Sequence, residues 1–63
     1  EITIEYSKPI QSIEILSLDG RRVQFYETNS SIIDLNLDHL TSGGYVIRVN
    51  AEEKSFTERI IKY

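Results

Sequence analysis

Short runs of alternating polar and apolar residues constrain this chain more than any other feature of its sequence. In the clearest run, Ile33, Leu35 and Leu37 are separated by single polar residues. A period of two places the apolar residues on one face of a β-strand and the polar residues on the other. The chain also has ten Ile and three Val but only one Ala and no Met, a composition typical of strands. The sequence therefore predicts an all-β domain.

Six segments have the pattern or composition of a strand. They are residues 1–6, 12–18, 21–27, 33–38, 45–49 and 55–62. Turn-forming residues separate them at regular, short spacings, which is typical of a β-sandwich. The connections are too short for the crossovers that parallel strands need. We therefore expect residues 1–63 to form a single domain, a small immunoglobulin-like antiparallel β-sandwich of about six to seven strands.

The dipeptide Asp19-Gly20 predicts a hairpin between the second and third of these segments. It is a strong signal for a two-residue type I′ turn, because Gly adopts the positive φ that this turn requires. After the turn, Val23 and Phe25 alternate, so we expect both to point inward.

The segment 12–18 changes the parity of its apolar residues at Leu16. This change indicates either a bulge near Leu16 or a strand that is buried on both faces, and we favour the central, doubly covered strand. Residues 7–9 and the turn formers at 28–31 are expected to end strands. Leu40 is expected to be a buried plug in the loop that follows the fourth segment.

Charge and composition argue against several classes of function. The net charge is −3, whereas nucleic-acid binding usually needs a basic surface. There is no Cys for a disulfide, and one His without Cys leaves no zinc ligand set. The longest uncharged run, from His39 to Ile47, is much shorter than a membrane span of about 20 residues. The chain opens on Glu1 without a basic and apolar leader, so we expect no signal peptide here.

Two apparent motifs have simpler explanations. Asp34, Asn36 and Asp38 have the spacing that opens a calcium loop, but that loop needs Gly and Glu where His39 and Tyr45 stand. Asp38 and His39 are neighbours in sequence, and adjacent side chains do not normally form the hydrogen bond of a hydrolytic triad. We therefore expect no metal, no cofactor and no catalytic residue.

Five parts of the chain follow one another in a characteristic order. They are an apolar strand, a turn with Gly and basic residues, an alternating strand ending in Leu, a small-residue turn leading to Tyr, and a last strand with basic residues, at residues 13–18, 19–23, 33–40, 41–49 and 56–62. In this order the chain resembles the C-terminal sorting domain of the type IX secretion system, also called the Por secretion tail. It departs from that family at Gly44, where a branched apolar residue is usual. The Asn-Pro segment that usually precedes the first strand is also missing, which implies a domain without its entry strand.

The resemblance implies a sorting signal and not an enzyme. Such a domain directs an exported cargo, attached at its N-terminal side, through the periplasm and the outer membrane to the cell surface or the medium. Its implied partners are the outer-membrane type IX translocon and a surface sortase that commonly removes the domain. The residues that match the family's motifs, and are implied to act in recognition, are Gly20, Gly43, Gly44, Tyr45, Arg59, Ile60 and Lys62.

The sequence leaves open a second class of function and the oligomeric state. A generic immunoglobulin-like spacer, or a carbohydrate- or protein-binding module of a cell-surface protein, would have the same composition and strand pattern. An uncovered strand edge would also favour an edge-to-edge or strand-swapped homodimer.

Overall fold

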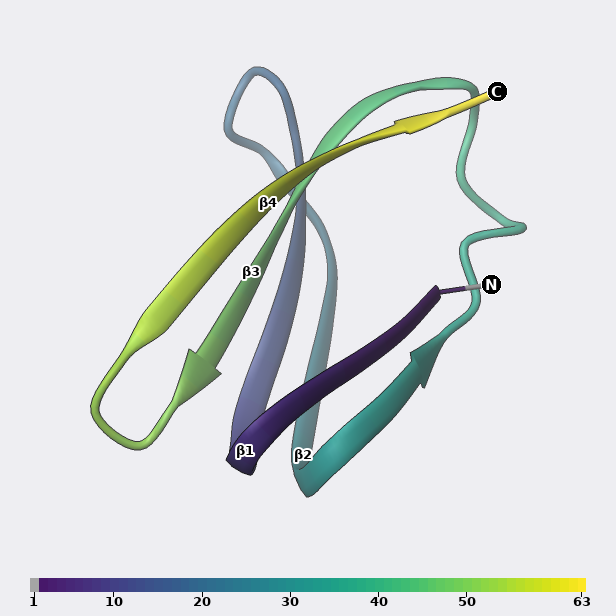
Figure 1. The fold of residues 1–63 in the computed structure, drawn as a ribbon. Coiled ribbons are helices and arrows are strands. Elements are labelled where there is room, and N and C mark those ends of the chain that lie inside the picture. Colours follow the sequence, from purple (N-terminus) through teal and green to yellow (C-terminus); the bar gives the residue numbers. More distant parts are fainter. Residues whose placement is uncertain (1) are drawn as a thin grey trace.

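The computed structural model describes residues 2–63 and contains four β-strands. They are β1 (Ile2–Ser17), β2 (Arg22–Leu35), β3 (Gly43–Ala51) and β4 (Ser55–Lys62). The strands form one sheet in the order β2-β1-β3-β4, and each neighbouring pair is antiparallel (Figure 1). The predicted all-β class and antiparallel pairing are therefore confirmed. The part of the chain that the structure describes holds no helix long and apolar enough to cross a membrane.

The number of strands differs from the predicted six to seven because two expected loops lie inside strands. β1 continues through residues 7–9, and β2 continues through residues 28–31. The register passes from the pair Glu5–Ile32 to the pair Ile10–Ser30, five steps along β1 against two along β2. β1 therefore has three extra residues at this point.

The extra residues bend the long ribbon formed by β1 and β2. In Figure 1 the first half of β1 and the second half of β2 leave the bend together and diverge from β3 and β4. Ile2, Ile4 and Tyr6 in the bent half still pack against the core. Tyr6 also meets Phe56 of β4 edge to face, with ring centroids 5.0 Å apart. One sheet that bends over itself thus takes the place of the predicted two-sheet sandwich.

The core lies inside this bend and contains residues from three strands and the loop after β2. Its buried members are Ile10, Ile13, Ile15, Leu35, Leu37, Tyr45 and Ile47. The inward faces predicted for residues 33–37 and 45–49 are confirmed. Leu40 is half-buried and packs against this cluster, so it is a partly covered plug.

The start of β2 faces the other way from our prediction. Val23 and Phe25 are 38% and 43% exposed, whereas Tyr26 packs against the core. The register skips Val23, which is therefore an extra residue, a β-bulge, beside Leu16. Leu16 is only half-buried, and Leu18, just after β1, is 62% exposed, so the segment 12–18 is not buried on both faces. β1 is a central strand, and a bulge does lie near Leu16, but its extra residue is in β2. β1 itself pairs with β3 without a break from Ser12 to Ser17, so Leu16 lies on the opposite face from Ile13 and Ile15.

The β1–β2 hairpin has a different turn from the predicted type I′. Gly20 has φ +90°, and among residues 2–63 no residue other than Gly has a positive φ, so Asp19 cannot adopt a type I′ conformation. The Gly20 N–H donates to the Ser17 carbonyl at 2.9 Å, and the Ser17 N–H donates to the Arg21 carbonyl at 2.8 Å. These bonds define a three-residue connection with Gly in the left-handed position, the usual alternative for a hairpin.

Candidate functional site

Six of the seven residues implied in recognition lie where β3 begins and β4 ends. The two strands are paired there, and we call residues 43–46 together with residues 59–62 the terminal ladder. Its pairs are Gly43–Lys62, Gly44–Ile61, Tyr45–Ile60 and Val46–Arg59. Residues from distant parts of the sequence are thereby placed side by side.

Tyr45 anchors the terminal ladder to the core and to the preceding loop. Its side chain is only 7% exposed. Its hydroxyl donates to the Thr41 carbonyl at 2.7 Å and lies 3.2 Å from the Thr41 hydroxyl. A buried Tyr hydroxyl needs such a partner, because an unpaired polar group is costly away from water.

Lys62 holds the same loop from the other side. Its Nζ donates to the Leu40 carbonyl at 3.2 Å, although Lys62 is the last residue of β4. The loop is also tied to β2 through a contact between His39 Nε2 and Gln24 Oε1. The loop between β2 and β3 is therefore fixed by β2, β3 and β4 together.

The two glycines of the terminal ladder have different roles. Gly43 has φ +149°, a conformation that other residues rarely adopt. At Gly44 a Cβ would lie 2.7 Å from Leu18 Cδ1, so the Leu18 side chain occupies the space that a branched residue would need. Gly20 is not part of the ladder, but it belongs to the same hairpin connection as Leu18.

Arg59 and Ile60 point to opposite faces of β4. Ile60 is half-buried and packs against the core, whereas Arg59 is exposed. The ion pairs within residues 2–63 involve other groups, since Glu14 contacts Arg22 at 3.4 Å and Arg48 at 3.3 Å. Arg59 thus presents its charge on the outer face of the outermost strand.

An apolar strip that the sequence did not predict runs across the outer face of the terminal ladder. It consists of Leu16, Leu18, Val46 and Ile61. Leu16 pairs with Val46, while Leu18 lies against Gly44, the partner of Ile61. Leu18 and Ile61 are each 62% exposed. The available signal was the second parity of apolar residues in β1, which we had interpreted as burial.

Asp19 supports the hairpin that carries Leu18. Its carboxylate accepts hydrogen bonds from the Ser17 hydroxyl and from the Arg21 N–H. The Ser17 hydrogen bond, followed by the Arg21 N–H, lowers the pKa of Asp19 below its usual value. These hydrogen bonds stabilise the turn, and they involve no second acid or base.

The residues with calcium-loop spacing are used in local hydrogen bonds. The Thr3 hydroxyl donates to Asp34 Oδ1 at 2.7 Å, and the Asp38 N–H donates to Asn36 Oδ1 at 2.9 Å. Across residues 2–63, no group of three or more His, Cys, Asp or Glu side chains is placed to hold a metal ion.

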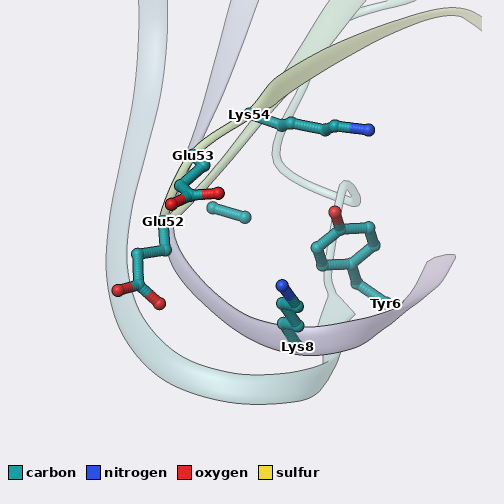
Figure 2. A pocket seen from close by; sticks show the side chains of 6 residues that line it. Tyr6, Lys8, Glu52, Glu53 and Lys54 are labelled. Atoms are coloured by element: carbon teal, nitrogen blue, oxygen red, sulfur yellow. The ribbon is translucent and has the colours of Figure 1, made fainter.

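A polar hollow of about 340 Å³ lies at the other end of β3, beside the β3–β4 turn. In Figure 2, Lys8 and Tyr6 rise from β1 toward this space, and Lys54 extends over it from the turn. Glu53 lies on the turn side, while the Glu52 carboxylate points away from Tyr6. Charges of both signs line the hollow, so it has no clear preference for one kind of ligand.

Comparison with known proteins identifies the family. The family model for the secretion system C-terminal sorting domain matches residues 1–63, and the chain belongs to this family, the sorting domains of type IX secretion. Comparisons with curated proteins and with solved structures found no match. The domain is therefore a C-terminal sorting signal that works with the type IX secretion machinery on a cargo at its N-terminal side. A protein that carries it is secreted or displayed at the cell surface after export through the outer membrane.

Proposed function

We propose that the terminal ladder is the part of this sorting signal that the outer-membrane translocon recognises. The observation that supports the proposal is the gathering of six motif residues on two adjacent strands. β4 is an edge strand, and on it Arg59 is exposed beside Leu18 and Ile61 of the apolar strip, which are each 62% exposed. A positive group beside exposed apolar side chains suits a partner surface with acidic and apolar residues.

We also propose how the cargo reaches the outer membrane and how the domain is removed afterwards. The cargo passes through the periplasm in transit, and a surface sortase removes the domain after the outer membrane has been crossed. The domain itself has no catalytic role in this proposal. In support, His39, the one His of the chain, contacts the amide of Gln24 and not a nucleophile or a carboxylate.

The test is export of a fluorescent reporter with an N-terminal export signal and residues 1–63 at its C-terminus. Export is measured in a strain with a working type IX system and in its translocon-null twin. The double variant Arg59→Ala/Lys62→Ala removes both cations of the ladder, and Arg48→Ala/Lys54→Ala is the control with the same change in charge. We expect the ladder variant to lose roughly tenfold or more in export, since the exposed Arg59 charge is removed and the loop loses its Lys62 contact at the Leu40 carbonyl.

Export that depends on the translocon and falls only in the ladder variant supports the proposal. Equal export by both variants, with each shown to be folded, contradicts it. Reporter retained in the periplasm of both strains would instead favour the immunoglobulin-like spacer or binding module.

A homodimer that forms through an uncovered strand edge or by strand exchange is a further part of the proposal. β2 and β4 are the outer strands of the sheet, and an exposed edge can pair with another copy. Light scattering after size-exclusion chromatography tests it, because a strict monomer at millimolar concentration would contradict the dimer.

A further inference from the structure

An apolar groove lies between the first half of β1 and β4. Two adjoining hollows of about 320 and 290 Å³ form it, and they share Ile4, Glu5, Val49 and Glu58. Val49 of β3 lies between the two walls, since β3 pairs with β4 and the bent half of β1 packs against the core. We call this feature the β1–β4 groove. It shares Ile60 with the terminal ladder and Tyr6 with the polar hollow of Figure 2, and its other lining residues belong to neither.

Both walls of the β1–β4 groove are strand edges without a partner. Residues 2–5 of β1 pair with β2, and pairing of β1 with β3 begins only at Ile10. β4 pairs with β3 on one side and, within residues 2–63, with no strand on the other. Backbone N–H and C=O groups along both walls are therefore available for pairing with an added strand.

The charge of the groove has one sign. Glu5 from the β1 wall and Glu58 from the β4 wall each line both hollows. The other lining residues of the two hollows are uncharged: Ile2, Thr3, Ile4, Tyr6, Ile47, Val49, Phe56 and Ile60. An acidic, apolar groove favours an occupant that is apolar and basic.

We propose that the β1–β4 groove binds one extended segment of another polypeptide, in which apolar residues alternate and at least one residue is Lys or Arg. The segment adds to the free edge of β1, where its main chain forms hydrogen bonds and every second side chain faces Val49 and Ile4. Its basic residue lies between Glu5 and Glu58. A second copy of this chain fits this groove less well, because its net charge of −3 would bring acid against acid, so the proposed homodimer would pair through the outer edge of β2.

The length of the site follows from the register. The free edge of β1 covers the residues paired as Ile2–Leu35 to Glu5–Ile32. At about 3.3 Å per residue these residues span about 13 Å, so a segment of about four residues covers the edge and one of five to seven residues extends slightly past it at each end. The export route does not enter this argument, and the groove charges Glu5 and Glu58 lie outside the terminal ladder, so the groove can be tested independently of both.

The test uses the 63-residue chain and a capped seven-residue peptide in which Val alternates with Thr and Lys. Binding is followed by the amide chemical shifts of the chain during titration. One comparison peptide has Glu in place of Lys, and another carries N-methyl groups on alternate backbone amides. The variant Glu5→Lys/Glu58→Lys reverses both groove charges, and Glu52→Lys/Glu53→Lys in the β3–β4 turn is the control with the same net change.

We expect saturable shifts confined to residues 2–7, 55–60 and Val49. The groove variant should bind the Lys peptide on the order of tenfold more weakly and prefer the Glu peptide, since two attractions become repulsions. The turn variant should change much less, and the N-methylated peptide should not bind. If the groove variant does not fold, Glu5→Gln/Glu58→Gln provides the same comparison with a smaller loss.

Several results would overturn the proposal. They are no saturable shift at millimolar peptide, shifts centred elsewhere, equal losses in the groove and turn variants, or equal binding of the N-methylated peptide. Shifts of the groove residues that depend on the concentration of the chain alone would assign the groove to a second copy.

Discussion

The two halves of β1 share an alternating pattern of Ile residues but lie in different surroundings. In the second half, β1 has β2 on one side and β3 on the other, and Ile13 and Ile15 are fully buried. In the first half only β2 is paired, and Ile2 and Ile4 are half-buried. The alternation determines which face is apolar. The number of neighbouring strands determines how deeply that face is covered.

This difference separates stability from accessibility within one strand. The second half of β1, which is paired on both sides, contributes the buried apolar side chains of this strand. The bent half contributes one wall of the β1–β4 groove and a free edge. A small domain can thus have a rigid centre and an open margin, since local opening requires less free energy where fewer contacts are buried.

Truncating one Ile in each half should give the largest contrast. Ile13→Ala is expected to lower the free energy of unfolding by about 2–5 kcal/mol, because a fully buried side chain is replaced by a cavity. Ile4→Ala should cost only about 1 kcal/mol, because much of its surface already meets water. Urea unfolding measures both, and Ile32→Ala on the exposed face of β2 is the control.

Amide hydrogen exchange sharpens the same comparison without mutation. Residues 13–15 should exchange only through global unfolding, whereas residues 2–5 should exchange through local opening. Equal losses for the two Ile variants, or equal protection of both halves, would show that the bend leaves β1 uniformly stable.

A smaller effect is expected at the start of β3, the strand that pairs with the second half of β1. Gly43→Ala should lower the free energy of unfolding by about 1–3 kcal/mol, because its φ of +149° is unfavourable for Ala. Gly44→Ala should cost less than about 1 kcal/mol, because the exposed Leu18 side chain can move away from the new methyl group.

Urea unfolding again gives both values, and Gly44→Ala/Leu18→Ala is the control for the contact. A larger loss at Gly44 than at Gly43 would mean that Leu18 is held firmly in place. The accessible end of the sheet would then be as rigid as its centre.

The smallest effect concerns Asp19 and acid. Hydrogen bonds from Ser17 and the Arg21 N–H hold the pKa of Asp19 below its usual 3.8 in the folded state. The ionised group therefore stabilises the fold above that value, and this contribution is lost as pH falls through 3.8 toward the lower folded pKa.

Urea midpoints measured from about pH 5 to about pH 2.5 should fall less for Asp19→Asn than for the unmodified chain. Asp38→Asn is the matched control outside the hairpin. If the urea midpoints of Asp19→Asn and of the unmodified chain fall in parallel, the ionised Asp19 does not stabilise the hairpin.

Much of the sheet was predictable because some segments have one apolar parity. Residues 33–37 alternate without interruption, residues 45–49 do so except at the apolar Val46, and the inward faces of both are as predicted. The bulge at Val23 was not predictable, since it depends on the strand that β2 pairs with. The polar residues 28–31 were expected to form a loop, but turn formers are tolerated in a strand where the chain bends.

The candidate site was predictable only in part. The resemblance supplied residues such as Gly43 and Lys62, but their proximity follows from the β3–β4 register. The apolar strip and the β1–β4 groove have no comparable signal. Both arise from where the sheet ends and where it bends, which neighbouring residues in the sequence do not specify.

The position of β4 has a consequence for synthesis. β4 is the last strand in chain order, and it pairs with β3 from Asn50–Ser55 to Gly43–Lys62. Until these residues leave the ribosome, β3 lacks one neighbour and Lys62 cannot bind the loop carbonyl at Leu40. A chain cut short before Ser55 would lack the terminal ladder altogether. With the terminal ladder as the proposed recognition element, the signal is complete only on a cargo whose translation has continued into β4, which would keep prematurely terminated products out of the export route.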